Sequence, residues 1–197
     1  MGAAASFAFL TLALAHAGSA VTAAAPAPPR VTVVVEVDAQ RARVFHDDRA
    51  VLDVRVAFGQ AEGPKVQQGD NKTPRGRYRV LNKSKGPFGG RWAAYYGGHW
   101  IKVSYPNSDD ADRGLRDGLI SKAEAAAIKR ADARGVLPPQ NTALGGGIGF
   151  HGWIEEWQDP AAGEPPLGLS WGCIVLHLHD VAAFYAAVPE GAVVEIR

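Results

Sequence analysis

Hydrophobic and polar positions near the start of the chain predict three consecutive strands. Residues 30–37 are rich in Val and Thr without clear alternation, which is typical of a strand buried on both faces. Two further strands are predicted over 41–46 and 51–58, and the polar turn 47–49 separates them. The simplest arrangement of these segments is an antiparallel meander.

The remaining pattern adds three more strands and two helices. Strands are predicted over 77–81, 100–105 and, after a turn at 189–191, over 192–196. Residues 123–134 are good helix formers, Ser121 and Glu124 match a capping box, and Gly135 stands where such a helix ends. A second helix is predicted over 180–188 from its apolar spacing. The first helix falls in an insertion, 106–147, that we expect beside the sheet.

The first residues have the pattern of a secretory signal. Residues 3–15 are almost wholly apolar, too few for a helix to span a hydrocarbon core of roughly 30 Å, and small residues follow them. No Lys or Arg precedes the apolar run. We predict a signal peptide over 1–25, a Pro-rich linker over 26–30 and one domain over 31–197. The protein is then exported to the periplasm or cell wall, with no membrane span in its mature form.

Composition and charge exclude several classes of function. The chain has 197 residues and 47% hydrophobic composition, which suits one well-buried domain. Its 21 basic and 20 acidic residues give a net charge of +1 without a basic stripe, so no nucleic acid partner is expected. Residues 113–124 superficially resemble a calcium loop, but Arg113 and Leu115 would occupy ligand positions. We predict no metal site and no cofactor.

One cysteine and one histidine are the candidates for chemistry. Cys173 is the only cysteine, so an exported domain would have no internal disulfide. It directly follows Gly172, and His151 lies 22 residues earlier, within a loop length that can return to the same place. A thiol nucleophile needs such a base. The same residues also fit a small buried cysteine and a structural histidine, and both interpretations stay open on these features.

Several motifs in order resemble one known family. Residues 147–152 (Gly-Ile-Gly-Phe-His-Gly) and 170–176 (Ser-Trp-Gly-Cys-Ile-Val-Leu) resemble the His-Gly and Ser-x-Gly-Cys motifs of the L,D-transpeptidase catalytic domain, the YkuD-type family. Residues 69–76 resemble its Gly-Asp-x-x-Thr-Pro-x-Gly motif, 104–107 its Ser-Tyr-Pro-Asn segment, and 189–196 its closing strand. The resemblance covers the chain from about Val31 onward. It implies a mainly β fold, a β-sandwich or mixed sheet with short helices and a helix-bearing insertion.

The resemblance also implies roles for individual residues. Cys173 would be the nucleophile and His151 its proton acceptor and donor. The backbone carbonyl of Gly152 would orient the imidazole. The N–H groups of Gly172 and Cys173 would stabilise the oxyanion, and Ser170 would brace the loop through hydrogen bonds.

Two departures from the family pattern concern substrate binding. Trp171 stands where many members have His, and Val175 stands where many have Arg or Asn. We expect Trp171 to line the acyl-donor pocket, and Tyr105 to contribute to substrate binding. Trp153 and Trp157 would be platforms for sugar or peptide, and the insertion 106–147 would cover the cleft as a lid.

The function implied is an exported, cysteine-dependent L,D-transpeptidase acting on peptidoglycan stem peptides in cell-wall remodelling. Cys173 would form an acyl-enzyme, and an amine would accept the acyl group. One alternative is a hydrolase on the same scaffold that cleaves stem-peptide or peptidoglycan–protein links. Another is a non-catalytic peptidoglycan-binding module in which Cys173 is merely buried.

Overall fold

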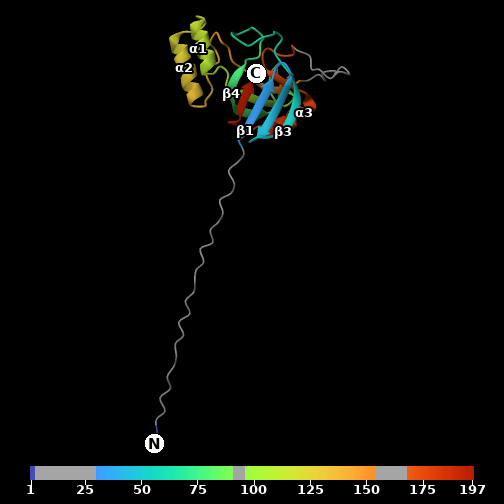
Figure 1. The fold of residues 1–197 in the computed structure, drawn as a ribbon, viewed down its shortest axis with the longest axis vertical. Coiled ribbons are helices and arrows are strands. Elements are labelled where there is room, and N and C mark those ends of the chain that lie inside the picture. The colour runs from blue at the N-terminus through green and yellow to red at the C-terminus, as the bar shows by residue number, and fades with distance from the viewer. Residues whose placement is uncertain (3–29, 91–95, 154–167) are drawn as a thin grey trace.

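The computed structural model describes residues 1–2, 30–90, 96–153 and 168–197. Nearly all of the predicted signal peptide and of the predicted linker lies outside these ranges, as does Trp157. The elements, in chain order, are β1 (Val31–Glu36), β2 (Arg41–His46), β3 (Arg49–Ala57), β4 (Gly76–Lys85), β5 (His99–Val103), α1 (Ser108–Arg116), α2 (Lys122–Ala133), β6 (Gly149–Gly152), β7 (Ile174–Leu176), α3 (Leu178–Ala187) and β8 (Val193–Ile196) (Figure 1).

The strands of the described residues close into a barrel in the order β1-β2-β3-β7-β6-β5-β4-β8. The predicted antiparallel meander is confirmed, because β1 pairs with β2 and β2 with β3 in antiparallel fashion. Two neighbouring pairs are parallel, β1 with β8 and β6 with β7. Strand directions are therefore mixed, and the second parallel pair is the one that positions the candidate site.

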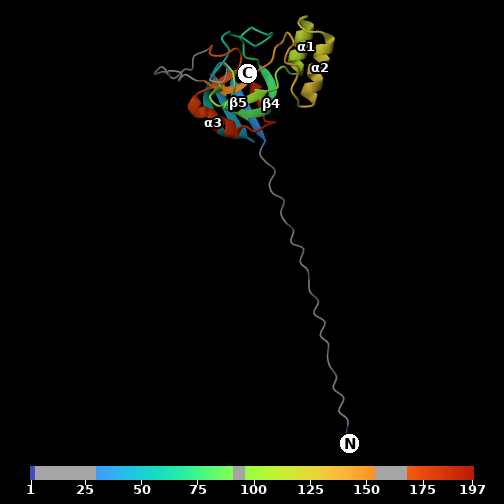
Figure 2. The ribbon, with the colours of Figure 1, turned by 180° about the vertical axis from the view of Figure 1, so that it is seen from behind.

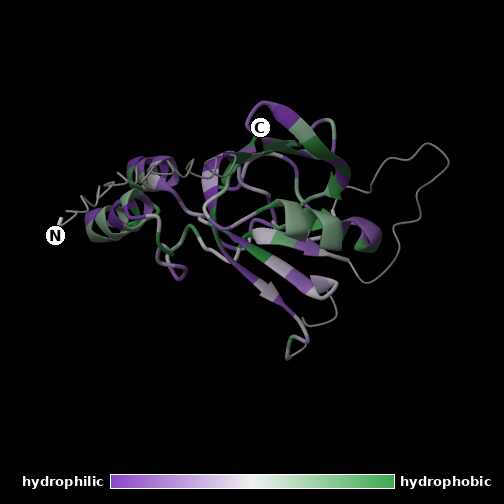
Figure 3. Cartoon of the chain, turned by 90° about the horizontal axis from the view of Figure 1, so that it is seen from below, coloured by the Kyte–Doolittle hydropathy of each residue, from purple (hydrophilic) through white to green (hydrophobic). Residues whose placement is uncertain are grey.

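One face of each long strand supplies the core. Val31, Val33 and Val35 of β1 are buried, whereas Thr32, Val34 and Glu36, which alternate with them, are partly exposed. The prediction that this strand is buried on both faces is wrong, because a closed barrel turns alternate side chains inward and the others outward. Figure 3 shows hydrophobic and hydrophilic positions interspersed along the strands of the barrel, in keeping with side chains that alternate between its inside and outside.

Two helices form a separate cluster on one flank of the barrel. Both predicted helices are confirmed as α2 and α3, and α2 begins with the predicted capping box of Ser121 and Glu124. Helix α1 was not predicted, although Asn107 and Asp110 form a second capping box at its start. Helices α1 and α2 pack through a small apolar cluster of their own. They lie on the flank of the barrel opposite α3 (Figures 1 and 2).

The expected fold class is confirmed as mainly β with short helices and a helix-bearing insertion. Over the described ranges, no helix is long and apolar enough to cross a bilayer.

Candidate active site

The parallel pair β6–β7 brings the two candidate residues to one cavity. His151 pairs in register with Val175, and Cys173 immediately precedes β7. Both line a cavity of about 200 Å³. Its lining residues are Tyr96, Trp100, Gly146, Gly147, Ile148, His151, Trp153, Ser170, Trp171 and Cys173. The lining is largely aromatic and glycine-rich, so the thiol faces a mainly apolar space.

The imidazole of His151 is held by its own strand and by aromatic neighbours. The side chain is buried, with 5% exposed. Its Nδ1 lies 2.7 Å from the carbonyl oxygen of Gly152, and since a carbonyl only accepts, Nδ1 carries the hydrogen. In the neutral ring, Nε2 is then the nitrogen able to take a proton. Trp100 stacks on the imidazole at 5.8 Å between centroids, and Tyr96 meets it edge-on at 5.4 Å.

The thiol of Cys173 is protonated at neutral pH in this arrangement. Burial raises its pKa to about 11, even though the residue keeps some exposure. The backbone N–H of Gly149 and the positive charges of Lys102 and Lys65 oppose that rise without cancelling it. The sulfur lies 3.5 Å from the carbonyl oxygen of Gly147, in reach of a weak S–H hydrogen bond. Such a thiol needs a base at the moment of attack.

Ser170 ties the loop before the nucleophile together. Its hydroxyl donates to the carbonyl oxygen of Cys173 at 2.7 Å and accepts from the backbone N–H of Gly172 at 3.1 Å. The bracing contacts expected of Ser170 are therefore present. The Gly172 N–H is engaged by Ser170 in this structure, and its expected part in binding an oxyanion stays a prediction. The N–H of Cys173 stays a candidate donor.

The loop is anchored in turn to the end of β3. The N–H of Ser170 donates to the carbonyl oxygen of Phe58, and the N–H of Gln60 donates to that of Ser170, both at 3.0 Å. Between them, the N–H of Gly59 donates to Oγ1 of Thr73 at 3.0 Å. The Thr-Pro motif thus holds the strand extension on which the Ser-x-Gly-Cys loop rests.

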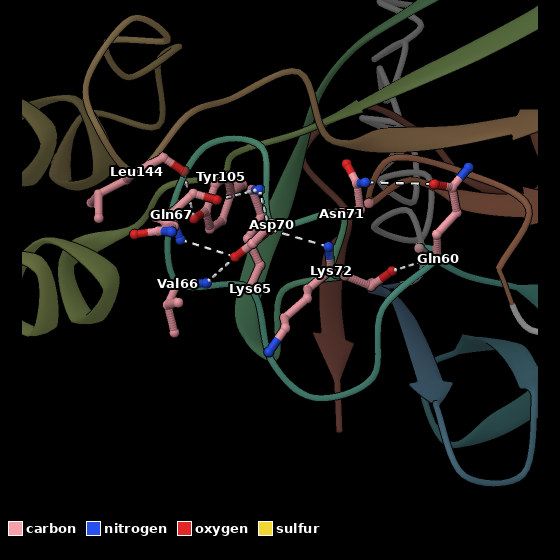
Figure 4. Close-up of polar contacts among 12 residues, drawn as sticks. Gln60, Lys65, Val66, Gln67, Asp70, Asn71, Lys72, Tyr105 and Leu144 are labelled. Carbon is pink, nitrogen blue, oxygen red and sulfur yellow. Dashed lines mark hydrogen bonds and ion pairs between the residues drawn. The ribbon is translucent and has the colours of Figure 1, made fainter.

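The motif that contains Asp70 forms a network of hydrogen bonds beside this loop (Figure 4). The carboxylate of Asp70 accepts from the ammonium of Lys65 at 2.8 Å and from the backbone N–H groups of Val66, Gln67 and Lys72. Burial opposes its charge, but these hydrogen bonds together hold the pKa of Asp70 below its usual value. The carbonyl oxygen of Lys72 lies only 2.6 Å from where a Cβ on Gly172 would stand.

The predicted substrate-binding residues divide into two groups. Trp171 is half exposed and lines the cavity, as does Trp153. Tyr105 is fully buried, its hydroxyl donates to the carbonyl oxygen of Leu144 at 3.0 Å, and it does not line the cavity. Its expected substrate-binding role is therefore wrong. The strand before it turns this ring into the interior, where it packs edge-on against Tyr78.

The predicted lid is also corrected. Only Gly146 and Gly147, at the end of the insertion, line the cavity, while α1 and α2 supply no lining residue. Conversely, Tyr96 and Trp100 are site residues that the sequence analysis missed. The strand pattern around 100–105 was the available signal, because alternation places Trp100 on the face opposite the buried Ile101.

Among the described residues, no group of three or more His, Cys, Asp or Glu side chains is arranged to hold a metal ion. The fold and site together define a mixed β barrel that presents a cysteine and a histidine from neighbouring parallel strands. The family model of the L,D-transpeptidase catalytic domain, YkuD, matches residues 30–196. The chain therefore belongs to the YkuD-type L,D-transpeptidase catalytic domain family.

Solved structures that are similar to this chain are distant from it in sequence. The helical cell shape determining protein Pgp2 from Campylobacter jejuni is 21% identical, with a TM-score of 0.54 over 86% of this chain and 48% of that one. Bd1075 of Bdellovibrio bacteriovorus is 18% identical, with a TM-score of 0.52 over 86% and 48%. An L,D-transpeptidase from Mycobacterium smegmatis is 18% identical, with a TM-score of 0.47 over 86% and 59%.

The match to Pgp2 and Bd1075 covers about half of the length of each. A comparison with curated protein sequences gave no significant match.

Proposed function

We propose that this protein is an exported, cysteine-dependent L,D-transpeptidase that acts on peptidoglycan stem peptides in cell-wall remodelling. The observation that supports this most is that Cys173 and His151 line one cavity, with His151 Nδ1 held by the Gly152 carbonyl. That hydrogen bond leaves Nε2 as the base for a thiol that is protonated at rest. Family membership supplies the reaction class.

In the acylation step, Nε2 of His151 takes the thiol proton as the sulfur attacks the carbonyl carbon at the L-centre of the diaminoacyl residue. The tetrahedral intermediate then expels D-alanine by breaking the C–N bond, and the imidazolium gives its proton to the leaving amine. The product is a thioester on Cys173. An acceptor amine attacks this thioester, its proton passes to His151, and the regenerated thiolate recovers that proton.

The backbone N–H of Cys173 is the first candidate to bind the oxyanion. The N–H of Gly172 can join it only when its hydrogen bond to Ser170 is released. One donor is worth about 2.7–4 kcal/mol of transition-state stabilisation in comparable acyl-transfer sites. Ser170 would keep its bond to the Cys173 carbonyl during this change and so preserve the position of the nucleophile.

The cellular part of the proposal rests on the apolar start of the chain. A signal peptide over 1–25 would deliver the domain 31–197 to the periplasm or cell wall, where stem peptides are found. Pgp2 is described as a determinant of helical cell shape. We include a role in cell shape in the proposal for this chain.

The decisive experiment incubates the purified protein with a stem tetrapeptide, with and without an added D-amino acid, and follows products by mass spectrometry. The proposal expects cross-linked or exchanged products, and none from Cys173→Ala. Trimmed tripeptide without amine incorporation would identify the hydrolase instead. Binding without any product would identify the non-catalytic module.

A further inference from the structure

A lysine stands beside the candidate nucleophile without an assigned role. Lys102 lies on β5 opposite Gly149 of β6, and Trp100 lies opposite His151 in the same antiparallel pair. Because side chains alternate along a strand, Lys102 and Trp100 share the face of the sheet that carries the imidazole. The two residues that flank Lys102 point into the barrel core instead.

Gly149 allows this row of side chains to form. A Cβ at Gly149 would stand 2.5 Å from the carbonyl oxygen of Ile101 and 2.8 Å from the Trp100 indole, so only glycine fits against this strand and beneath that ring. The indole stacks on His151 with 22° between planes, and the ammonium of Lys102 lies 6.0 Å from the indole centroid. Lysine, indole and imidazole therefore follow one another on one face of the sheet. The indole and the imidazole line the cavity, and Lys102 lies next to that lining, behind Trp100 in the row.

The charge of Lys102 acts on Cys173 and, among the residues that the structure describes, has no ion-pair partner. Its pKa is lowered by burial and raised in part by the thiolate form of Cys173. Lys65 also acts on the sulfur, but its ammonium is paired with Asp70 at 2.8 Å. Over the described part of the chain, Lys102 forms no ion pair, and the cavity lining contains no acidic side chain. The cation is thus available to an anionic group that enters the cavity.

We propose that Lys102 is a specificity-determining residue that binds a free carboxylate of the acyl donor beside Cys173. This inference rests on the proposed function, because it takes stem peptides as the substrate class. A tetrapeptide donor carries one carboxylate on the D-alanine that leaves and another on the side chain of its diaminoacyl residue. Pairing either with Lys102 offsets the cost of burying charge in a mainly aromatic pocket. Donors that are amidated at that carboxyl group lose the pair.

The test compares three tetrapeptides, one with both carboxylates free, one amidated at the diaminoacyl side chain, and one amidated at the C-terminus. We measure kcat/KM for the wild type, Lys102→Met and Lys102→Arg. Lys85→Met is the matched control, because Lys85 lies on the adjacent strand with its ammonium over Tyr185. Thermal unfolding of each variant verifies that it folds.

The wild type should prefer the free peptide over one amidated form by about 10–100-fold, the size of one lost charge-assisted hydrogen bond. Lys102→Met should abolish that preference, Lys102→Arg should retain much of it, and Lys85→Met should behave as the wild type. The amidated peptide that the wild type uses less well than the free peptide identifies which carboxylate is bound. Equal losses of Lys102→Met on all three peptides, or no loss, would overturn the proposal.

A readout without turnover separates this inference from the proposed function. Binding of the three peptides to Cys173→Ala is compared with binding to Cys173→Ala/Lys102→Met by calorimetry. Weaker binding in the double variant of the free peptide and of the one amidated peptide that keeps the paired carboxylate, with unchanged binding of the third, supports the role of Lys102 even if no enzymatic product is found. Identical binding of all three peptides to both proteins contradicts it even in an active enzyme.

Discussion

His151 stands in register with Val175, two residues after Cys173, across the parallel strands β6 and β7. Parallel neighbours run in the same direction, so the chain must travel away and return between them. The 21 residues between His151 and Cys173 span that return. The candidate base is thus fixed within a strand, and the nucleophile is fixed directly before the neighbouring strand. Residues held on or next to regular elements keep a well-defined distance and orientation relative to each other.

The first prediction concerns the backbone of the nucleophile loop. Gly172 has φ +128°, and a Cβ there would meet the carbonyl oxygen of Lys72 at 2.6 Å. Gly172→Ala should therefore displace the loop, remove nearly all activity and cost about 1–3 kcal/mol of unfolding free energy. Product formation and urea unfolding measure the two effects.

Gly191→Ala is the matched control for this substitution. Gly191 also has a positive φ, +83°, but a Cβ there meets nothing within 4 Å. It should lose some stability through backbone strain and keep its activity. Equal activity losses in both variants would show that strain alone, and not contact with Lys72, disturbs the site.

The second prediction concerns the buried ion pair beneath the site. Asp70→Ala leaves the ammonium of Lys65 buried without its carboxylate, so we expect a loss of about 3–5 kcal/mol in unfolding free energy. Asp53→Ala breaks exposed pairs with Arg41 and Arg43 and should cost at most about 1 kcal/mol. Urea denaturation at pH 7 compares the two variants. Similar small losses would show that the Asp70 pair is dispensable.

The same carboxylate gives a pH dependence with a definite sign. The folded pKa of Asp70 lies below its unfolded value of about 3.9. Its stabilising effect is complete above that unfolded value and is lost as the pH falls through the folded pKa. The wild type should therefore lose stability more steeply than Asp70→Ala when unfolding is measured from pH 5 down to pH 2.

Much of this site was predictable because its chemistry is local in sequence. Glycines beside Cys173 and His151, together with the motif order, were sufficient to nominate both residues and the Gly152 carbonyl. The helix α2 was equally clear from its capping box. These features depend on residues a few positions apart, where spacing and structure are directly linked.

What escaped prediction depends on how distant strands pair. Trp100 is part of the site only because β5 pairs with β6. Tyr105 is not part of it, because its ring lies in the interior. The hydrogen bond from the N–H of Gly172 to the hydroxyl of Ser170 was likewise not predicted. Motif matching assigns a role to a residue type, whereas the direction of a side chain or N–H is set by the tertiary packing.

The third prediction concerns the resting thiol. Since burial raises the pKa of Cys173 to about 11, alkylation by iodoacetamide should be slow at pH 7 and rise steeply toward pH 11. The chain in denaturant should titrate near the ordinary value of about 8.5. Because the folded pKa is higher, stability should decrease as the pH rises through that window. A folded midpoint at or below 8.5 would show a thiol already activated at rest.

The last prediction concerns His151 and Cys173 as one catalytic unit. If Nε2 of His151 takes the thiol proton, neither residue can perform its step without the other. Each single Ala variant should lose about 10³-fold or more in product formation, and the double variant should be scarcely worse. Cys173→Ala should keep its stability within about 1 kcal/mol, because only a sulfur atom is removed. Initial rates and urea unfolding of the three variants measure both effects.

His179→Ala is the control for this pair, because His179 is largely exposed and its Nε2 lies 3.3 Å from Asp180. It should retain wild-type activity. Losses that multiply in the double variant would show that His151 and Cys173 act independently. The base would then have to be another group, and a large loss in His179→Ala or His177→Ala would identify it. A steep rise of activity with pH that persists in His151→Ala would also show that His151 is not the base, since the rise would then reflect ionisation of the thiol alone.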